Sequence, residues 1–233
     1  MVLERTMKGA IVPLPAIWLM KTKAPTDIVE DINKYLDNLL KEDERKSQAG
    51  TLVGQIKKGE QLTVDHTHED VKELSSVLCM CAKQYIEAFF QRHNQAALSE
   101  REIQVYEMWS VHSYEGDYNP LHDHGVPSIM GLSCILYLKV PKQILDTDVT
   151  SHLFDSSGVQ DGHLVFNYGI DSQLDYERLK PPSSILIKPR VGEIYIFPSW
   201  LQHMVFPFSG EGERRSLSAN ITAQRKEIKQ EEI

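Results

Sequence analysis

The spacing of apolar residues changes near position 103, from the period of about 3.6 that marks helices to the two-residue alternation that marks strands. Before this point, two segments carry an apolar stripe on one helical face. They predict a helix over 27–41 and a longer helix over 69–94. The stretch between them, 42–65, is polar and contains glycines, so we expect a loop there with room for one short strand at 51–56.

After position 103, short alternating runs are separated by turns rich in Gly, Pro, Ser and Asp, which is typical of a β-sandwich or barrel. Residues 11–20 predict one further strand, at a sheet edge because it contains two prolines. We expect 141–161 and 168–182 to be loops that cover a pocket. The predicted strands after position 103 are 105–112, 133–140, 163–167, 184–188, 193–197, 201–206 and 214–224.

The pattern therefore predicts a mainly β fold with N-terminal helices. A chain of 233 residues is long enough to bury one sizeable core. We expect residues 1–224 to form a single domain, in which a helical extension of residues 1–100 packs on a β core of residues 101–224. Residues 225–233 are a charged tail.

Composition narrows the classes of partner. The net charge is −8 with both signs mixed, which argues against a nucleic-acid backbone as partner and favours a small molecule or a protein side chain. The one apolar run near the start, 9–20, is broken by Pro13 and Pro15, so we expect neither a signal peptide nor a membrane span. The three cysteines are typical of buried thiols in a reducing compartment, which predicts a cytoplasmic protein. The sequence leaves the oligomeric state undetermined.

Three histidines are candidates for metal ligands. His122 and His124 are two positions apart, so on an extended segment both imidazoles face one side and Asp123 faces the other. His203 lies in a second strand-like run and can complete the set, because imidazole is the commonest protein ligand for borderline metals. The alternative is that these are unrelated histidines among the nine in the chain. A second pair, His66 and His68, fits the turn that opens a helix.

Alternation along 214–224 separates two neighbouring arginines. The face that begins with Arg214 and Ser216 is polar, whereas the face that begins with Arg215 is apolar. A small barrel that holds a charged ligand would turn the polar face inward, and the planar guanidinium of Arg214 suits a carboxylate. The alternative is a surface ion pair between Arg214 and Glu211 or Glu213.

Five motifs together resemble the Fe(II)- and 2-oxoglutarate-dependent dioxygenases, and more narrowly a bacterial and phage branch of that superfamily. The resemblance covers about half of the chain, and its second half is the more specific. The motifs are H-x-H at 122–124, SCILYLKVP at 133–141, GHLVF at 162–166, GEIYIFPSWLQH at 192–203 and RRSLSAN at 214–220.

The resemblance implies a double-stranded β-helix, which is a jelly-roll or cupin-like barrel, with Fe(II) as cofactor. Most members have a carboxylate where this chain has His124. Three arrangements therefore stay open. The iron binds His122, His124 and His203; or it binds two histidines, with His124 serving the substrate or 2-oxoglutarate; or a bulge brings Asp123 to the metal.

The same resemblance implies that Arg214 and Ser216 bind the far carboxylate of the cosubstrate 2-oxoglutarate. Tyr137 either lines the cofactor pocket beside them or belongs to the core. The expected reaction is hydroxylation of an unidentified small-molecule or peptidyl substrate, with release of succinate and CO2. One alternative is a three-histidine, cupin-like metal oxygenase or hydrolase without 2-oxoglutarate, which would not require Arg214. Another is a jelly-roll binding module without catalysis.

Overall fold

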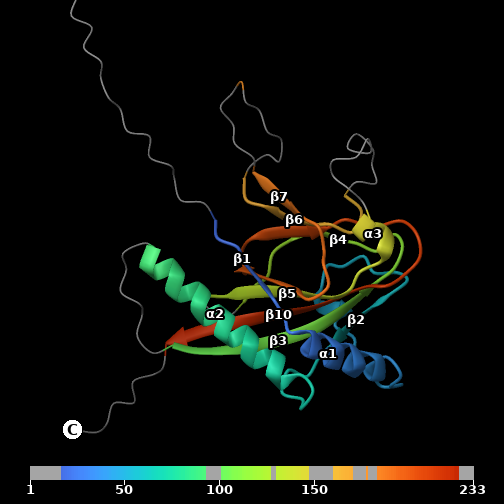
Figure 1. Ribbon diagram of the computed structural model, residues 1–233, viewed down its shortest axis with the longest axis horizontal. Helices are drawn as coiled ribbons and strands as arrows, with labels where there is room; N and C mark the ends of the chain where they lie inside the picture. Colours follow the sequence, from blue (N-terminus) through green and yellow to red (C-terminus); the bar gives the residue numbers. More distant parts are fainter. Residues whose placement is uncertain are drawn as a thin grey trace, which may run out of the picture.

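Figure 1 shows the computed structural model, which describes residues 17–92, 101–126, 130–146, 160–169, 177 and 183–225. Two antiparallel sheets form its centre. The six-stranded sheet contains, in spatial order, β1 (Met20–Lys23), β8 (Glu193–Pro198), β5 (Leu132–Lys139), β10 (Arg214–Arg225), β3 (Arg101–Ser113) and β2 (Glu60–Thr63). The four-stranded sheet contains β4 (Asn119–His122), β9 (Gln202–Val205), β6 (Leu164–Asn167) and β7 (Ser184–Ile187). The helices are α1 (Thr26–Leu39), α2 (Lys72–Arg92), α3 (Lys142–Asp146) and the short 3-10 helix η1 (Ala49–Thr51).

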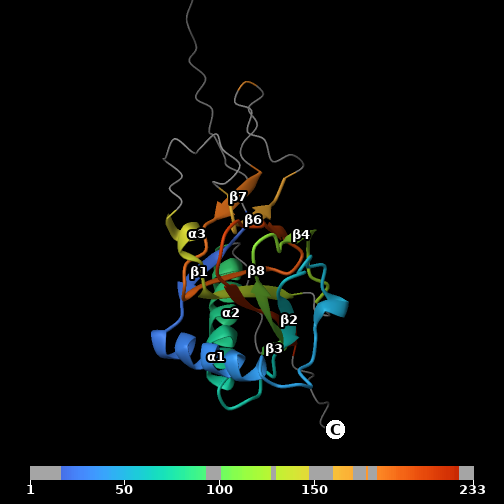
Figure 2. The same ribbon diagram turned by 90° about the vertical axis from the view of Figure 1, so that its right-hand side faces the viewer.

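The six-stranded sheet lies between two layers of different kinds (Figure 2). On one face, α1 and α2 pack against it through buried residues such as Ile32 and Leu78. On the other face, the four-stranded sheet packs against it through residues such as Phe166 and Phe197. The predicted mainly β fold with N-terminal helices is therefore confirmed. Within the described residues the two sheets face each other without pairing along their edges, so they do not close into a continuous barrel.

Strand β10 shows how alternation builds both layers. Leu217 and Ala219 belong to the core beneath the helices. Ser216 and Ser218 point to the opposite side, into the space between the sheets. The predicted division of this strand into a polar and an apolar face is therefore correct, and it aims polar side chains at one internal cleft.

All seven strands expected after position 103 are present, with ends that differ by a few residues. Three expectations for the rest of the chain were wrong. The predicted loop 42–65 contains β2, which pairs with β3, and the strand expected at 51–56 is reduced to a single bridge between Gln55 and Tyr118. The segment 141–161, expected to be a loop, begins with α3. Most of the strand expected at 11–20, like the tail 226–233, lies outside the described residues.

A partly buried ion cluster joins α1 to β10. Arg215 is only 1% exposed, and its guanidinium contacts Glu213 at 2.7 Å and Asp37 at 2.7 Å. Glu213 also accepts a hydrogen bond from His112 Nδ1 at 2.7 Å and contacts Lys139 Nζ at 3.1 Å. The sequence offered Glu211 or Glu213 as an alternative surface partner for Arg214. In the structure Glu213 instead pairs with the buried Arg215.

This cluster predicts a pH-dependent stability. Burial opposes the ionisation of Glu213, but hydrogen bonds from His112 and Arg215 outweigh it and lower the pKa of Glu213 to about 2. A lowered folded-state pKa stabilises the fold above the unfolded pKa of about 4.5 and loses that effect as the pH falls toward 2. We expect Glu213→Gln to lower the free energy of unfolding at pH 7 by about 3 kcal/mol.

Urea unfolding of wild type and Glu213→Gln at several pH values measures this effect. The difference between the two proteins should shrink to less than half of its neutral value by about pH 3, because the wild-type carboxylate is then losing its advantage. Glu211→Gln is the matched control, since Glu211 is exposed and lies two residues away. A difference that stays constant across this pH range would contradict the assignment.

Candidate active site

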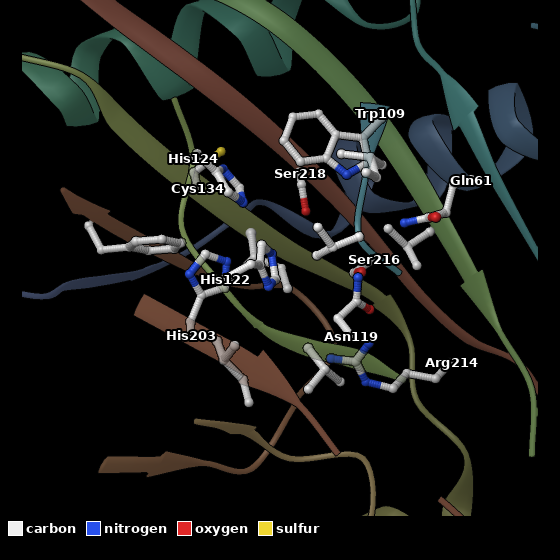
Figure 3. A pocket seen from close by; sticks show the side chains of 17 residues that line it. Gln61, Trp109, Asn119, His122, His124, Cys134, His203, Arg214, Ser216 and Ser218 are labelled. Atoms are coloured by element: carbon white, nitrogen blue, oxygen red, sulfur yellow. The ribbon is translucent and has the colours of Figure 1, made fainter. Parts of the chain in front are cut away.

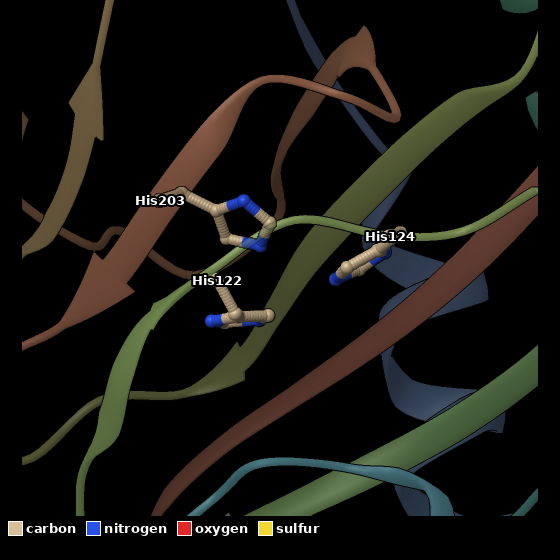
Figure 4. A group of neighbouring side chains, drawn as sticks. All are labelled: His122, His124 and His203. Carbon is tan, nitrogen blue, oxygen red and sulfur yellow. The ribbon is translucent and has the colours of Figure 1, made fainter.

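Three imidazoles converge in the cleft between the sheets (Figure 4). His122 ends β4 and lies directly opposite His203 of β9 in the strand pairing. His124 follows two residues later and is fixed by a hydrogen bond from its backbone N–H to the carbonyl of Ser199, at 2.8 Å. The candidate ligand atoms of the three side chains all lie within 4.8 Å of one another. Two chain segments therefore present three nitrogen ligands to one point.

Hydrogen bonds at Nδ1 set the orientation of all three rings. His122 and His203 each donate Nδ1–H to the carbonyl of the residue two positions earlier, at 2.6 and 2.9 Å. His124 donates Nδ1–H to Oδ1 of Asn220 at 2.8 Å, and Nδ2 of Asn220 donates to Glu107 at 2.6 Å. With Nδ1 protonated, the Nε2 lone pair of each ring is free for a metal, which is how metal-binding histidines are usually held.

Burial keeps these imidazoles neutral. It lowers the pKa of His122, and it lowers the pKa of His124 to about 4. The pKa of His203 falls to about 3 because of burial and, secondarily, the proximity of the other two rings. Neutral imidazole is the form that binds metal. In the described part of the chain this is the one group of three His, Cys, Asp or Glu side chains that could hold an ion, and Asp123 is exposed and not a member.

Arg214 lies at the other end of the same cleft (Figure 3). It is 1% exposed, as is Arg215. Arg215 is neutralised by Glu213 and Asp37, whereas Arg214 makes no ion pair with any described residue. Its Nε donates to the carbonyl of Gly162 at 3.1 Å, and burial lowers its pKa. A buried guanidinium without a counter-ion is costly unless an anion binds it.

Tyr137 and Ser216 surround this arginine. Ser216 on β10 pairs with Tyr137 on β5, and the Tyr137 ring centre is 5.4 Å from Cζ of Arg214. Burial raises the pKa of Tyr137, so its hydroxyl stays protonated. Neither Oη of Tyr137 nor Nη2 of Arg214 has a hydrogen-bond partner of good geometry among the described residues. These two buried donors fit a carboxylate that accepts from both.

The N-terminal half of the chain supplies cleft residues that the sequence did not predict. Leu52, Val53 and Gln61 line the cleft together with Asn119 and Trp109. Leu52, Val53 and Gln61 lie within 42–65, the stretch expected to be a loop with one short strand at 51–56, and no pattern there marks them as cleft residues. The position of Gln61 depends on the pairing of β2 with β3, which the sequence pattern does not show.

The remaining polar candidates have other roles. His66 and His68 lie in the turn before α2, as expected, and Nδ1 of His68 accepts from the backbone N–H of Asp70 at 3.2 Å. The three cysteines are free, with Cys81 and Cys134 buried. None of the helices in the described part of the chain combines the length and apolar character that a membrane span requires.

Sequence comparison identifies a family for the second half of the chain. Residues 107–220 match the model of a family described as "Putative 2OG-Fe(II) oxygenase". The matched segment contains His122, His124, His203 and Arg214, whereas Gln61 lies outside it. No curated protein sequence matches the chain significantly.

Solved structures share the fold at low sequence identity. A prolyl-4-hydroxylase from Pseudomonas putida is 15% identical, with 90% of this chain and 94% of that chain covered and a TM-score of 0.53. SnoK, a non-heme alpha-ketoglutarate-dependent carbocyclase from nogalamycin biosynthesis, is 10% identical, with coverage of 91% and 84% and a TM-score of 0.59. A prolyl hydroxylase from Trichoplax adhaerens, solved with a peptide fragment of hypoxia inducible factor, is 11% identical, with coverage of 88% and 83% and a TM-score of 0.53. These likenesses confirm the double-stranded β-helix.

Proposed function

Because the chain belongs to the 2OG-Fe(II) oxygenases, which use Fe(II) and 2-oxoglutarate, we propose a role for each residue of the cleft. His122, His124 and His203 hold the iron. Arg214, with Ser216 and Tyr137, holds the far carboxylate of 2-oxoglutarate. The enzyme hydroxylates a small-molecule or peptidyl substrate.

The observation that carries this proposal is the buried guanidinium of Arg214, which has no counter-ion among the described residues, in the same cleft as three neutral imidazoles. The cleft thus has one end suited to a metal and another suited to an anion (Figure 3). 2-Oxoglutarate has a matching asymmetry, since its 2-oxo acid end chelates a metal and its other carboxylate is free. A three-histidine enzyme that used no such cosubstrate would leave Arg214 buried without a counter-ion.

The bound iron and cosubstrate supply the oxidation, in which one oxygen atom of O2 enters a substrate C–H bond and the other enters succinate as CO2 leaves. The protein prepares this chemistry by position. The carbonyl and amide partners at Nδ1 fix which nitrogen of each histidine faces the metal. Arg214 sets the direction in which the cosubstrate lies. Three neutral ligands leave the full charge of Fe(II) to be balanced by the dianionic cosubstrate, which favours its binding.

An anaerobic titration tests the proposal. Adding Fe(II) and then 2-oxoglutarate to the purified protein should produce the visible metal-to-ligand charge-transfer band, and admission of O2 should then release succinate. Protein that holds iron but gives neither the band nor succinate would contradict the proposal. That result would favour the three-histidine metal enzyme that does without 2-oxoglutarate.

A further inference from the structure

We infer that the substrate carries a positive charge, as an ammonium or guanidinium group, close to the carbon that is oxidised. This inference rests on the proposed function, because it concerns the space beside the proposed iron site. A cavity of about 310 Å³ opens there, with His122 and His124 in its wall. It shares Leu52, Val53 and Trp109 with the cleft that leads to Arg214, so the two form one continuous site.

The charged groups of this outer cavity are acidic. Glu107 and Asp123 line it, and its described lining contains neither Lys nor Arg. Within the described residues, neither carboxylate takes part in an ion pair. Glu107 receives one hydrogen bond, at Oε1 from Nδ2 of Asn220 at 2.6 Å, which leaves its second oxygen available. Two carboxylates without counter-ions in a partly enclosed space favour a cation there.

A count of formal charges gives the number of positive charges that the substrate should bring. The three imidazole ligands are neutral, so Fe(II) and the dianion of 2-oxoglutarate cancel. Arg214 adds one positive charge, and Glu107 with Asp123 adds two negative charges. The loaded site therefore carries one net negative charge. A substrate with a single positive group at the outer cavity makes the whole site neutral.

A second, independent feature indicates that the cleft receives a polar ligand. Gln61 is 3% exposed, and its Nε2 has no hydrogen-bond partner among the described residues. Figure 3 shows its amide directed into the cleft beside Trp109. A side chain at Gly54 would approach this amide to 2.7 Å, so the glycine leaves the space that the amide occupies. An unpaired buried donor calls for an acceptor, such as a carbonyl or carboxylate of the bound ligand.

Aromatic side chains in the wall of the outer cavity also favour a cation. Tyr106 is 51% exposed and lines the outer cavity beside Glu107. Trp109 lines the same cavity from a buried position. An aromatic face next to a carboxylate attracts alkylammonium and guanidinium groups more than neutral or anionic ones.

Three Nα-acetylated amino acids of equal chain length, named below by the amino acid alone, test the charge preference: L-lysine, L-norleucine and L-2-aminoadipate. The acetyl group removes the α-ammonium charge, and the side chains end in an ammonium, a methyl and a carboxylate group. Each is titrated anaerobically into wild-type protein loaded with Fe(II) and 2-oxoglutarate, and the shift of the charge-transfer band gives its affinity. Lysine should bind at least about tenfold more tightly than norleucine, and aminoadipate more weakly still. Equal affinities, or no shift by lysine up to about 20 mM, would overturn the inference.

Variants assign the preference to the two carboxylates. Glu107→Gln removes the charge but keeps an acceptor for Asn220. Asp123→Asn removes the second negative charge. Each should reduce the preference for lysine over norleucine about tenfold, or to equality. Glu102→Gln, an equal charge change at an exposed position of β3, should not alter it. Because the band itself reports the iron and 2-oxoglutarate site, a normal band without charge preference contradicts only this inference, whereas absence of the band contradicts the proposed function.

Discussion

Replacement of His203 by alanine is expected to abolish iron binding at micromolar metal and to lower turnover at least about 1,000-fold. The reason is geometric, because His203 is the one proposed ligand that comes from β9, directly opposite His122 in the strand pairing. Without it, the remaining two imidazoles come from one short segment and no longer surround the ion. Loss of one ligand also removes chelation that the fold has already organised. Metal analysis after gel filtration and succinate release measure the two effects.

The matched control for this variant is His68→Ala, which removes an imidazole from the turn before α2 and should leave iron content and turnover unchanged. His124→Asp is the informative companion. It restores the carboxylate that most of the superfamily carries and should still bind iron if position 124 is a ligand. Retention of wild-type iron affinity by His203→Ala would contradict the three-histidine site.

Much of this site could be predicted because His122, His203 and Arg214 lie on strands, with His124 two residues beyond the end of β4. Alternation placed His122 and His124 on one face, and it separated Arg214 from Arg215. It worked on β10 because that strand has helices on one side and the cleft on the other, so each face has a distinct composition. The convergence of His203 with the first two histidines depends on long-range pairing, which the motif resemblance supplied and periodicity did not.

The parts that the sequence did not predict share a different physical cause. Strand β2 is four residues long and takes its structure from pairing with β3, so its own pattern gives no strand signal. The sequence pattern therefore did not predict Gln61, which lies on this strand, as a cleft residue. The pairing of Glu213 with Arg215 was not predicted either, because the sequence, which offered Arg214 as an alternative partner, does not show that α1 covers Arg215 and brings Asp37 to it. Tertiary contacts decided both cases.

Arg214→Met should weaken the binding of 2-oxoglutarate at least about 30-fold while leaving iron affinity unchanged. The guanidinium is the buried cation at the anion end of the cleft, and removal of one partner of a buried charge pair costs about 2–5 kcal/mol. Titration of the charge-transfer band with 2-oxoglutarate measures the loss in iron-loaded protein. Unchanged affinity would show that the cosubstrate carboxylate binds elsewhere.

The neighbouring position supplies the control, since Arg215→Met removes the same group from the same strand. Arg215 is paired with Glu213 and Asp37, so its loss removes one of the partners that hold the Glu213 carboxylate and should lower the free energy of unfolding by about 3 kcal/mol. Arg214 has no counter-ion among the described residues in the protein without cosubstrate, so Arg214→Met should leave that stability unchanged or raise it. Urea unfolding without 2-oxoglutarate should therefore show a lower free energy of unfolding for Arg215→Met and an unchanged or higher one for Arg214→Met. A loss of stability in Arg214→Met as large as in Arg215→Met would mean that Arg214 serves the fold rather than the cosubstrate.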